Sequence, residues 1–197
     1  MLERQSALAS ALNRGGRDGV GGARRLRLGE VRGWSLVQIA AFASTLSEFE
    51  QVVKPLLGSG LAARVGEVTT DGTRRLFKTG PEQFWIVGPA TDDLARGLQA
   101  AVAPGIGAVT PLSHSRTRIF VEGDAARELL AKGIPLDFHP AVFKVDQFAL
   151  TGLHHTPILL HQSGENRYEI YAMRTFALSV WEWLTDAALP FGYEVAG

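Results

Sequence analysis

Cysteine is absent from the 197-residue chain, and its absence removes several kinds of chemistry at once. Without a thiol there is no disulfide, no thiolate metal site, no iron–sulfur cluster and no cysteine nucleophile. An excess of charge is missing as well, because 20 basic residues balance 20 acidic ones. A neutral chain has no long-range field that gathers nucleic acid or an anionic membrane, so neither is expected as a partner.

Long hydrophobic runs are also lacking. No stretch approaches the roughly 20 apolar residues that a membrane-spanning helix needs. At the N-terminus, Ser6, Ser10 and Asn13 interrupt the short apolar run, which is unlike a secretory signal. The sequence therefore predicts a cytoplasmic protein. What is present, 46% hydrophobic and 20% charged residues, is typical of a globular fold.

One segment near the N-terminus, residues 14–29, is dominated by glycine and arginine. Glycine at this density does not hold a helix or strand interior, so residues 1–29 are expected to form an arm with a flexible linker. The glycines lack the preceding strand and following helix that a phosphate-binding loop requires. The basic residues of the arm are therefore expected to be solvated or to face a partner: Arg14, Arg17, Arg24, Arg25 and Arg27.

From residue 30 onward the pattern becomes regular and predicts one α+β domain over residues 30–197. The order strand, helix, several strands, helix occurs twice, in halves of about 30–107 and 108–197, which indicates an internal duplication. Within the first half, Asp71-Gly72 is a strong hairpin signal. Thr45 and Glu48 have the spacing of a capping box at the start of a helix.

Residues that could carry catalysis are few. His155 and His161 fall on one face of a predicted strand, but a metal site needs three or four convergent ligands. Only Asp146 and Glu165 lie near them in sequence, so turn and surface positions are expected for these histidines. Ser113 and His114 are adjacent and point to opposite faces of a strand, which argues against a nucleophile–base pair. Asp137-Phe-His139 offers polar groups on a loop and nothing more. No catalytic, cofactor-binding or metal-binding residue is predicted.

The final predicted helix, about Arg174 to Leu189, is apolar on two sides. One side carries Phe176, Val180, Trp183, Leu184 and Ala187, and the other carries Leu178, Trp181, Thr185, Ala188 and Leu189. A helix that is apolar nearly all round is buried on both sides. Either the chain's own arm or tail covers the second side, or a partner does. If a partner does, the expected interface comprises Leu178, Trp181 and Leu189, with Arg4 and Leu8 from the arm.

Four segments resemble the gamma subunit of heterotetrameric sarcosine oxidase: Arg4–Leu12, Gly80–Pro89, Leu112–Pro140 and Tyr168–Ala188. This resemblance implies one of four unlike subunits in a complex that oxidatively demethylates sarcosine to glycine, forming hydrogen peroxide and, with tetrahydrofolate, a methylene-folate. It also implies a fold related to the folate-binding domain of glycine-cleavage aminomethyltransferases.

The resemblance further implies that this chain binds no cofactor itself. FAD, covalent FMN and NAD are expected on the alpha and beta subunits and zinc on the delta subunit, while this chain packs against alpha and through it meets beta and delta. In isolation it is expected to form a homodimer through the same surface. Two alternatives stay open: a free-standing folate-binding or aminomethyltransferase-like protein, and a nucleic-acid-associated protein that uses the basic arm.

Overall fold

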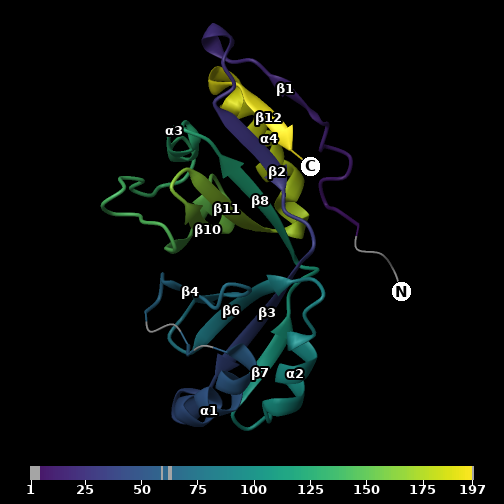
Figure 1. Cartoon of the computed structure of the whole chain (residues 1–197), viewed down its shortest axis with the longest axis vertical. Coiled ribbons are helices and arrows are strands. Elements are labelled where there is room, and N and C mark those ends of the chain that lie inside the picture. The colour runs from purple at the N-terminus through teal and green to yellow at the C-terminus, as the bar shows by residue number, and fades with distance from the viewer. Residues whose placement is uncertain (1–4, 59, 62–63, 197) are drawn as a thin grey trace. The chain divides into compact units, whose positions relative to one another are not determined.

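The computed structural model describes residues 5–58, 60–61 and 64–196, and the chain divides into two compact units (Figure 1). The second unit is the continuous segment Gly33–Ser113, whereas the first combines Met1–Arg32 with His114–Gly197. The sequence predicts two similar halves within one domain, and in the structure the chain forms two compact units. The expected boundary at residues 107/108 lies close to the observed end of the second unit.

The second unit is a five-stranded sheet with two helices. Its elements are β3 (Trp34–Ala41), 3-10 helix η2 (Ala43–Thr45), α1 (Leu46–Leu57), β4 (Val68–Thr70), β5 (Arg75–Lys78), β6 (Gln83–Pro89), α2 (Leu94–Ala101) and β7 (Gly107–Pro111). The strand order is β4-β5-β6-β3-β7. Phe49 and Val53 of α1 and Leu98 of α2 pack with Ile39 and Ile86 of the sheet in one core.

The hairpin predicted at Asp71-Gly72 is confirmed, because Thr70 pairs with Arg75 and Gly72 adopts a φ of 91° in the turn. The Asp71 carboxylate accepts hydrogen bonds from the backbone N–H groups of Arg74 and Thr73, which lower the pKa of Asp71. The capping box predicted for Thr45 and Glu48 does not form. The Thr45 hydroxyl instead lies 3.1 Å from the carbonyl oxygen of Phe42 and 2.8 Å from that of Ile106.

The first unit is a seven-stranded sheet in the order β1-β12-β2-β8-β11-β10-β9. Its strands are β1 (Gly15–Arg17), β2 (Leu26–Glu30), β8 (Arg116–Glu122), β9 (Phe148–Leu153), β10 (Thr156–Gly164), β11 (Arg167–Met173) and β12 (Tyr193–Ala196). Its helices are α3 (Ala126–Ala131), α4 (Ala177–Ala188) and the short 3-10 turns η1 (Val20–Gly22), η3 (Arg174–Phe176) and η4 (Leu189–Phe191). Helix α4 runs along one face of this sheet (Figure 1).

The predicted duplication is confirmed by the topology of the two sheets. The second unit runs β3-α1-β4-β5-β6-α2-β7, and the first repeats this order from β8 through α3, β9, β10, β11 and α4 to β12. In both sheets the second, third and fourth of these strands lie in the same order on one side of the first strand. The difference is β2, which is inserted between β8 and β12 and pairs parallel with β12.

The flexible arm predicted over residues 1–29 is wrong for most of its length. Leu26 and Leu28 of β2 are 2% and 0% exposed, and β1 pairs antiparallel with β12. Leu8 is 0% exposed and packs with α3 and α4 in the core of the first unit. The sequence does not predict these contacts, because the high glycine content indicates a linker. The two leucines and the flanking arginines form too short a pattern to indicate a strand. Among the described residues, every helix is too short or too polar to cross a lipid bilayer.

Candidate functional site

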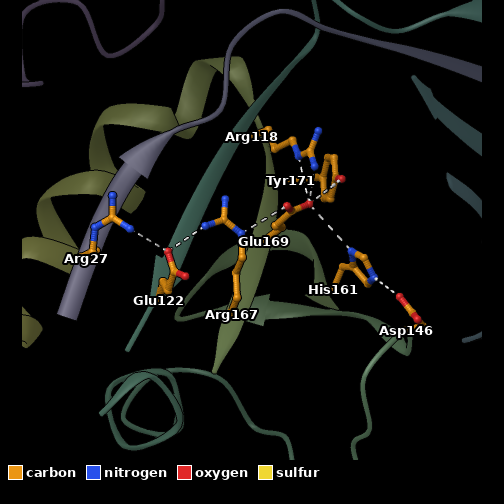
Figure 2. A network of polar contacts seen from close by, with 8 residues as sticks. All are labelled: Arg27, Arg118, Glu122, Asp146, His161, Arg167, Glu169 and Tyr171. Carbon is orange, nitrogen blue, oxygen red and sulfur yellow. Dashed lines mark hydrogen bonds and ion pairs between the residues drawn. The ribbon is translucent and has the colours of Figure 1, made fainter. Parts of the chain in front are cut away.

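A network of charged and polar side chains extends across β2, β8, β11 and β10 (Figure 2). Alternation along a strand places successive side chains on opposite faces of a sheet. Tyr168, Ile170 and Ala172 of β11 point into the core beneath α3 and α4. Glu169 and Tyr171, which alternate with them, therefore lie on the opposite face from the helices.

Strand register brings the network together. Glu169 is directly opposite His161 of β10, and Tyr171 is directly opposite Arg118 of β8. Directly opposed residues in an antiparallel pair are the closest cross-strand neighbours in a sheet. The contacts among these four side chains therefore follow from the pairing of three strands that are far apart in sequence.

Glu169 is the centre of the network and is only 2% exposed. Its Oε2 atom lies 3.0 Å from Nε and 2.7 Å from Nη2 of Arg118, and it accepts a hydrogen bond from the Tyr171 hydroxyl at 3.1 Å. The Arg118 guanidinium also lies over the Tyr171 ring, 5.5 Å from the centroid. Three donors on one carboxylate oxygen satisfy a charge that would otherwise be costly to bury.

His161 is fully buried between two carboxylates. Its Nδ1 atom is 3.8 Å from Oε2 of Glu169, and its Nε2 atom is 3.7 Å from Oδ1 of Asp146 (Figure 2). His155, by contrast, is exposed in the turn before β10, where its ring stacks edge-on near that of His154. The expected surface position is therefore wrong for His161. Within residues 5–58, 60–61 and 64–196, no group of three or more side chains is placed to hold a metal ion.

A second carboxylate links the outer part of the network. Glu122 of β8 accepts hydrogen bonds from Arg27 of β2 at 3.3 Å and from Arg167 of β11 at 2.9 Å. Arg167 also lies 3.8 Å from Glu169 and covers the Phe120 ring at 4.3 Å. The network thus connects β2, β8, β11 and β10, an arrangement that fixes strand register.

A separate ion pair organises the second unit. Arg74 donates from Nη2 to Oδ1 of Asp92 at 3.0 Å and from Nη1 to the carbonyl oxygen of Leu56 at 2.8 Å. Its hydrogen bond to Asp92 raises the pKa of Arg74. The guanidinium therefore joins the β4–β5 hairpin to the end of α1 and the start of α2.

The other candidate polar residues serve local structure. Ser113 accepts a hydrogen bond from the backbone N–H of Leu36 at 2.9 Å. Asp137 accepts one from the N–H of His139 at 2.8 Å, and the His139 ring accepts one from the N–H of Ala141 at 3.2 Å. The Ser113 contact joins two segments of the second unit, and the Asp137 and His139 contacts close a turn in the first unit.

The residues predicted to meet a partner fall into two groups. Leu178 and Leu189 are each 43% exposed, whereas Trp181 is 3% and Leu8 0% exposed. The expectation that Trp181 and Leu8 lie on an outer face is wrong, because the N-terminal segment packs against α4 and both side chains enter the same core. Arg4 lies outside the described residues.

A hollow of about 420 Å³ lies between α4, β12 and the segment that contains β1. Its lining includes Trp181, Tyr193 and Glu182, together with Arg14 and Arg17 of the N-terminal segment. Sequence reasoning missed this hollow, since it depends on the pairing of β1 with β12 at opposite ends of the chain.

The sarcosine oxidase gamma subunit family model matches residues 40–189. The sarcosine oxidase gamma subunit of Corynebacterium sp. (strain U-96) is 37% identical over 136 residues, which cover 68% of this chain and 66% of that protein. The corresponding subunit of Arthrobacter sp. is 36% identical over 137 residues, covering 68% of this chain and 67% of the relative. The matched segment thus spans about two thirds of the length of these relatives.

Two solved structures extend the comparison. A chain of the heterotetrameric sarcosine oxidase from Corynebacterium sp. U-96, in complex with pyrrole 2-carboxylate, superposes with a TM-score of 0.83 at 29% identity. That match covers 95% of this chain and 96% of the other. Aminomethyltransferase T of the glycine cleavage system from Bartonella henselae gives a TM-score of 0.64 at 18% identity, covering 88% of this chain and 48% of that protein. The second likeness shows a shared fold.

Proposed function

Because this chain belongs to the sarcosine oxidase gamma subunit family, we propose that it is the gamma subunit of a heterotetrameric sarcosine oxidase. In this role it packs against the alpha subunit, and through alpha it is joined to beta and delta. The complex oxidatively demethylates sarcosine to glycine and forms hydrogen peroxide and methylene-tetrahydrofolate. The observation that carries the proposal is the likeness to one chain of a heterotetrameric sarcosine oxidase, which covers 95% of this chain and 96% of the other.

The role of this chain within the complex is structural. Its most buried carboxylate, Glu169, accepts hydrogen bonds from Arg118 and Tyr171 and is 2% exposed, so it is engaged in holding strands together. Its apolar surface, in contrast, includes one leucine on α4 and one at the position that directly follows this helix. Leu178 and Leu189 are eleven positions apart, which at about 100° per residue places them within roughly 20° of each other.

These two leucines form the surface that we assign to the alpha subunit. Each is 43% exposed, and burying the exposed part of such a side chain against a partner is favourable at about 25 cal/mol per Å². Charged residues are depleted at the centre of protein interfaces, because burying a charge without a partner is costly. An aspartate at either position is therefore poorly tolerated in the assembled complex.

The double variant Leu178→Asp/Leu189→Asp is expected to reduce recovery of the alpha subunit by about tenfold or more, since two buried apolar contacts are lost and two charges are desolvated. The measurement is co-expression of this chain with its alpha subunit, followed by affinity capture and quantification of alpha. Val145→Asp is the matched control, because Val145 is also 43% exposed and lies in the loop between α3 and β9. Equal recovery of alpha with both variants would remove the assignment of this surface.

Cofactors belong to the other subunits in this proposal: FAD, FMN and NAD on alpha and beta, zinc on delta, with tetrahydrofolate also bound outside this chain. The chain purified alone is expected to show no visible flavin absorption, whereas the complex reconstituted with it does. Absorption spectra before and after denaturation, with metal analysis of the same samples, provide the measurement. Stoichiometric flavin or zinc in the isolated chain would contradict the proposed assignment of the cofactors to the other subunits.

A further inference from the structure

Five arginines lie between residues 14 and 27, and the structure separates them into two groups. Arg24 pairs with Asp18 at 2.6 Å, Arg25 with Asp124 at 3.1 Å, and Arg27 with Glu122 at 3.3 Å. Arg14 and Arg17 form no ion pair or hydrogen bond with any residue among 5–58, 60–61 and 64–196, and both line the hollow beside α4. The arginines that do not support the fold are therefore those at the cavity.

Two further residues that line the hollow carry a polar donor without a partner in the described part of the chain. Trp181 and Tyr193 are 3% and 7% exposed and both line the cavity. Neither the indole N–H nor the phenol O–H forms a hydrogen bond with a described residue. Buried Trp N–H and Tyr O–H groups usually do find a partner. Neither donor is among the fully enclosed atoms that lack a partner, so a ligand in the hollow can supply an acceptor to each of them.

The charge and size of the hollow define the ligand. Arg14 and Arg17 are opposed by one acidic residue, Glu182, so the lining carries one net positive charge. That balance matches a monoanion better than a doubly charged phosphate. The volume of about 420 Å³ is within the range of small-molecule sites, and the Trp181 and Tyr193 rings provide an apolar wall. Guanidinium groups bind carboxylates through paired charge-assisted hydrogen bonds.

We propose that the hollow between β1, β12 and α4 is a binding site for a small monocarboxylate with an aromatic or apolar body. The carboxylate is held by Arg14 and Arg17, and the Trp181 N–H and Tyr193 O–H donate to acceptors on the ligand. Glu182 disfavours a second negative charge. The site is independent of the proposed assembly role, because none of its residues belongs to the Leu178 and Leu189 surface.

Benzoate is the probe, and the full chain is titrated with it by calorimetry at fixed salt. We expect a Kd below about 1 mM. We also expect a loss of about tenfold or more in affinity for Arg14→Gln/Arg17→Gln, as charge-assisted hydrogen bonds are removed. Arg32→Gln/Arg96→Gln is the matched control, because it removes two exposed arginines that do not line the hollow and should leave the Kd unchanged. Uncharged benzamide should not bind.

A second readout places the ligand at Trp181. The indole N–H resonance that disappears in Trp181→Phe should shift when benzoate is added, while those of the other three tryptophans stay in place. The proposal is overturned if benzoate gives no heat, if both double variants bind equally well, or if a different indole shifts. Inorganic phosphate that binds as tightly as benzoate would overturn the assignment to a monocarboxylate.

Discussion

Replacing Arg118 with methionine is expected to lower the free energy of unfolding by about 3–5 kcal/mol, because Glu169 is then left buried without its main counter-charge. Arg118 and Glu169 are 8% and 2% exposed, and their closest N–O distance is 2.7 Å. Water cannot readily solvate the remaining carboxylate at this depth. The loss arises mainly from the stranded charge, and the net value of the intact pair is smaller.

Chemical denaturation followed by circular dichroism measures this loss of stability, and two further variants serve as comparisons. Arg27→Met breaks an exposed pair with Glu122 and should cost less than about 1 kcal/mol. Arg118→Met/Glu169→Met removes both charges and should be more stable than Arg118→Met alone. A loss in Arg118→Met no larger than that in Arg27→Met would show that the network contributes little to the fold.

Replacing Leu8 with alanine is expected to cost about 2–5 kcal/mol, the range for removing a fully buried leucine side chain and leaving a cavity. Leu8 is 0% exposed and packs with residues of α3, α4 and β12. Most of the core of the first unit comes from residues after 114, so the effect of Leu8 depends on the N-terminal segment being a fixed part of that core.

Leu178→Ala is the matched control for Leu8→Ala, since it truncates the same side chain at a position that is 43% exposed. Its cost should stay within about 1 kcal/mol, because a surface substitution leaves no enclosed cavity. Urea denaturation of both variants gives the comparison. If Leu8→Ala were as mild as Leu178→Ala, residues near the N-terminus would be a detachable arm, as the glycine content first suggested.

The burial of Leu8 and Trp181 changes the argument from the C-terminal helix. A helix that is apolar on two sides must be covered on both, and two explanations were compatible with the sequence. In the structure, each explanation holds for a different part of the second side. Trp181 is covered by the chain's own N-terminal segment, whereas Leu178 and Leu189 remain at the surface. Only the exposed pair supports contact with another subunit.

The buried network shows where sequence reasoning stops. Alternation in β8 and β11 is visible in the sequence, but it cannot say that His161 lies opposite Glu169 or that Arg118 lies opposite Tyr171. Those pairings depend on strand order and register, which are set by contacts between distant segments. A signal was present nonetheless, since Arg118 and Glu169 are charged residues within otherwise apolar strands and such residues are rarely buried without a partner.

The sequence by itself determined the α+β class, most strands and helices, and the duplicated order of elements, because local periodicity and turn residues decide these features. It also determined the family, through segments distributed along the chain. Only the tertiary structure decided that β2 enters the sheet between β8 and β12, that the two chain ends build one unit, and that Arg14 and Arg17 meet α4 across a hollow. These features join residues far apart in sequence, and short strands such as β1 and β2 are stabilised by the neighbours they pair with rather than by their own composition.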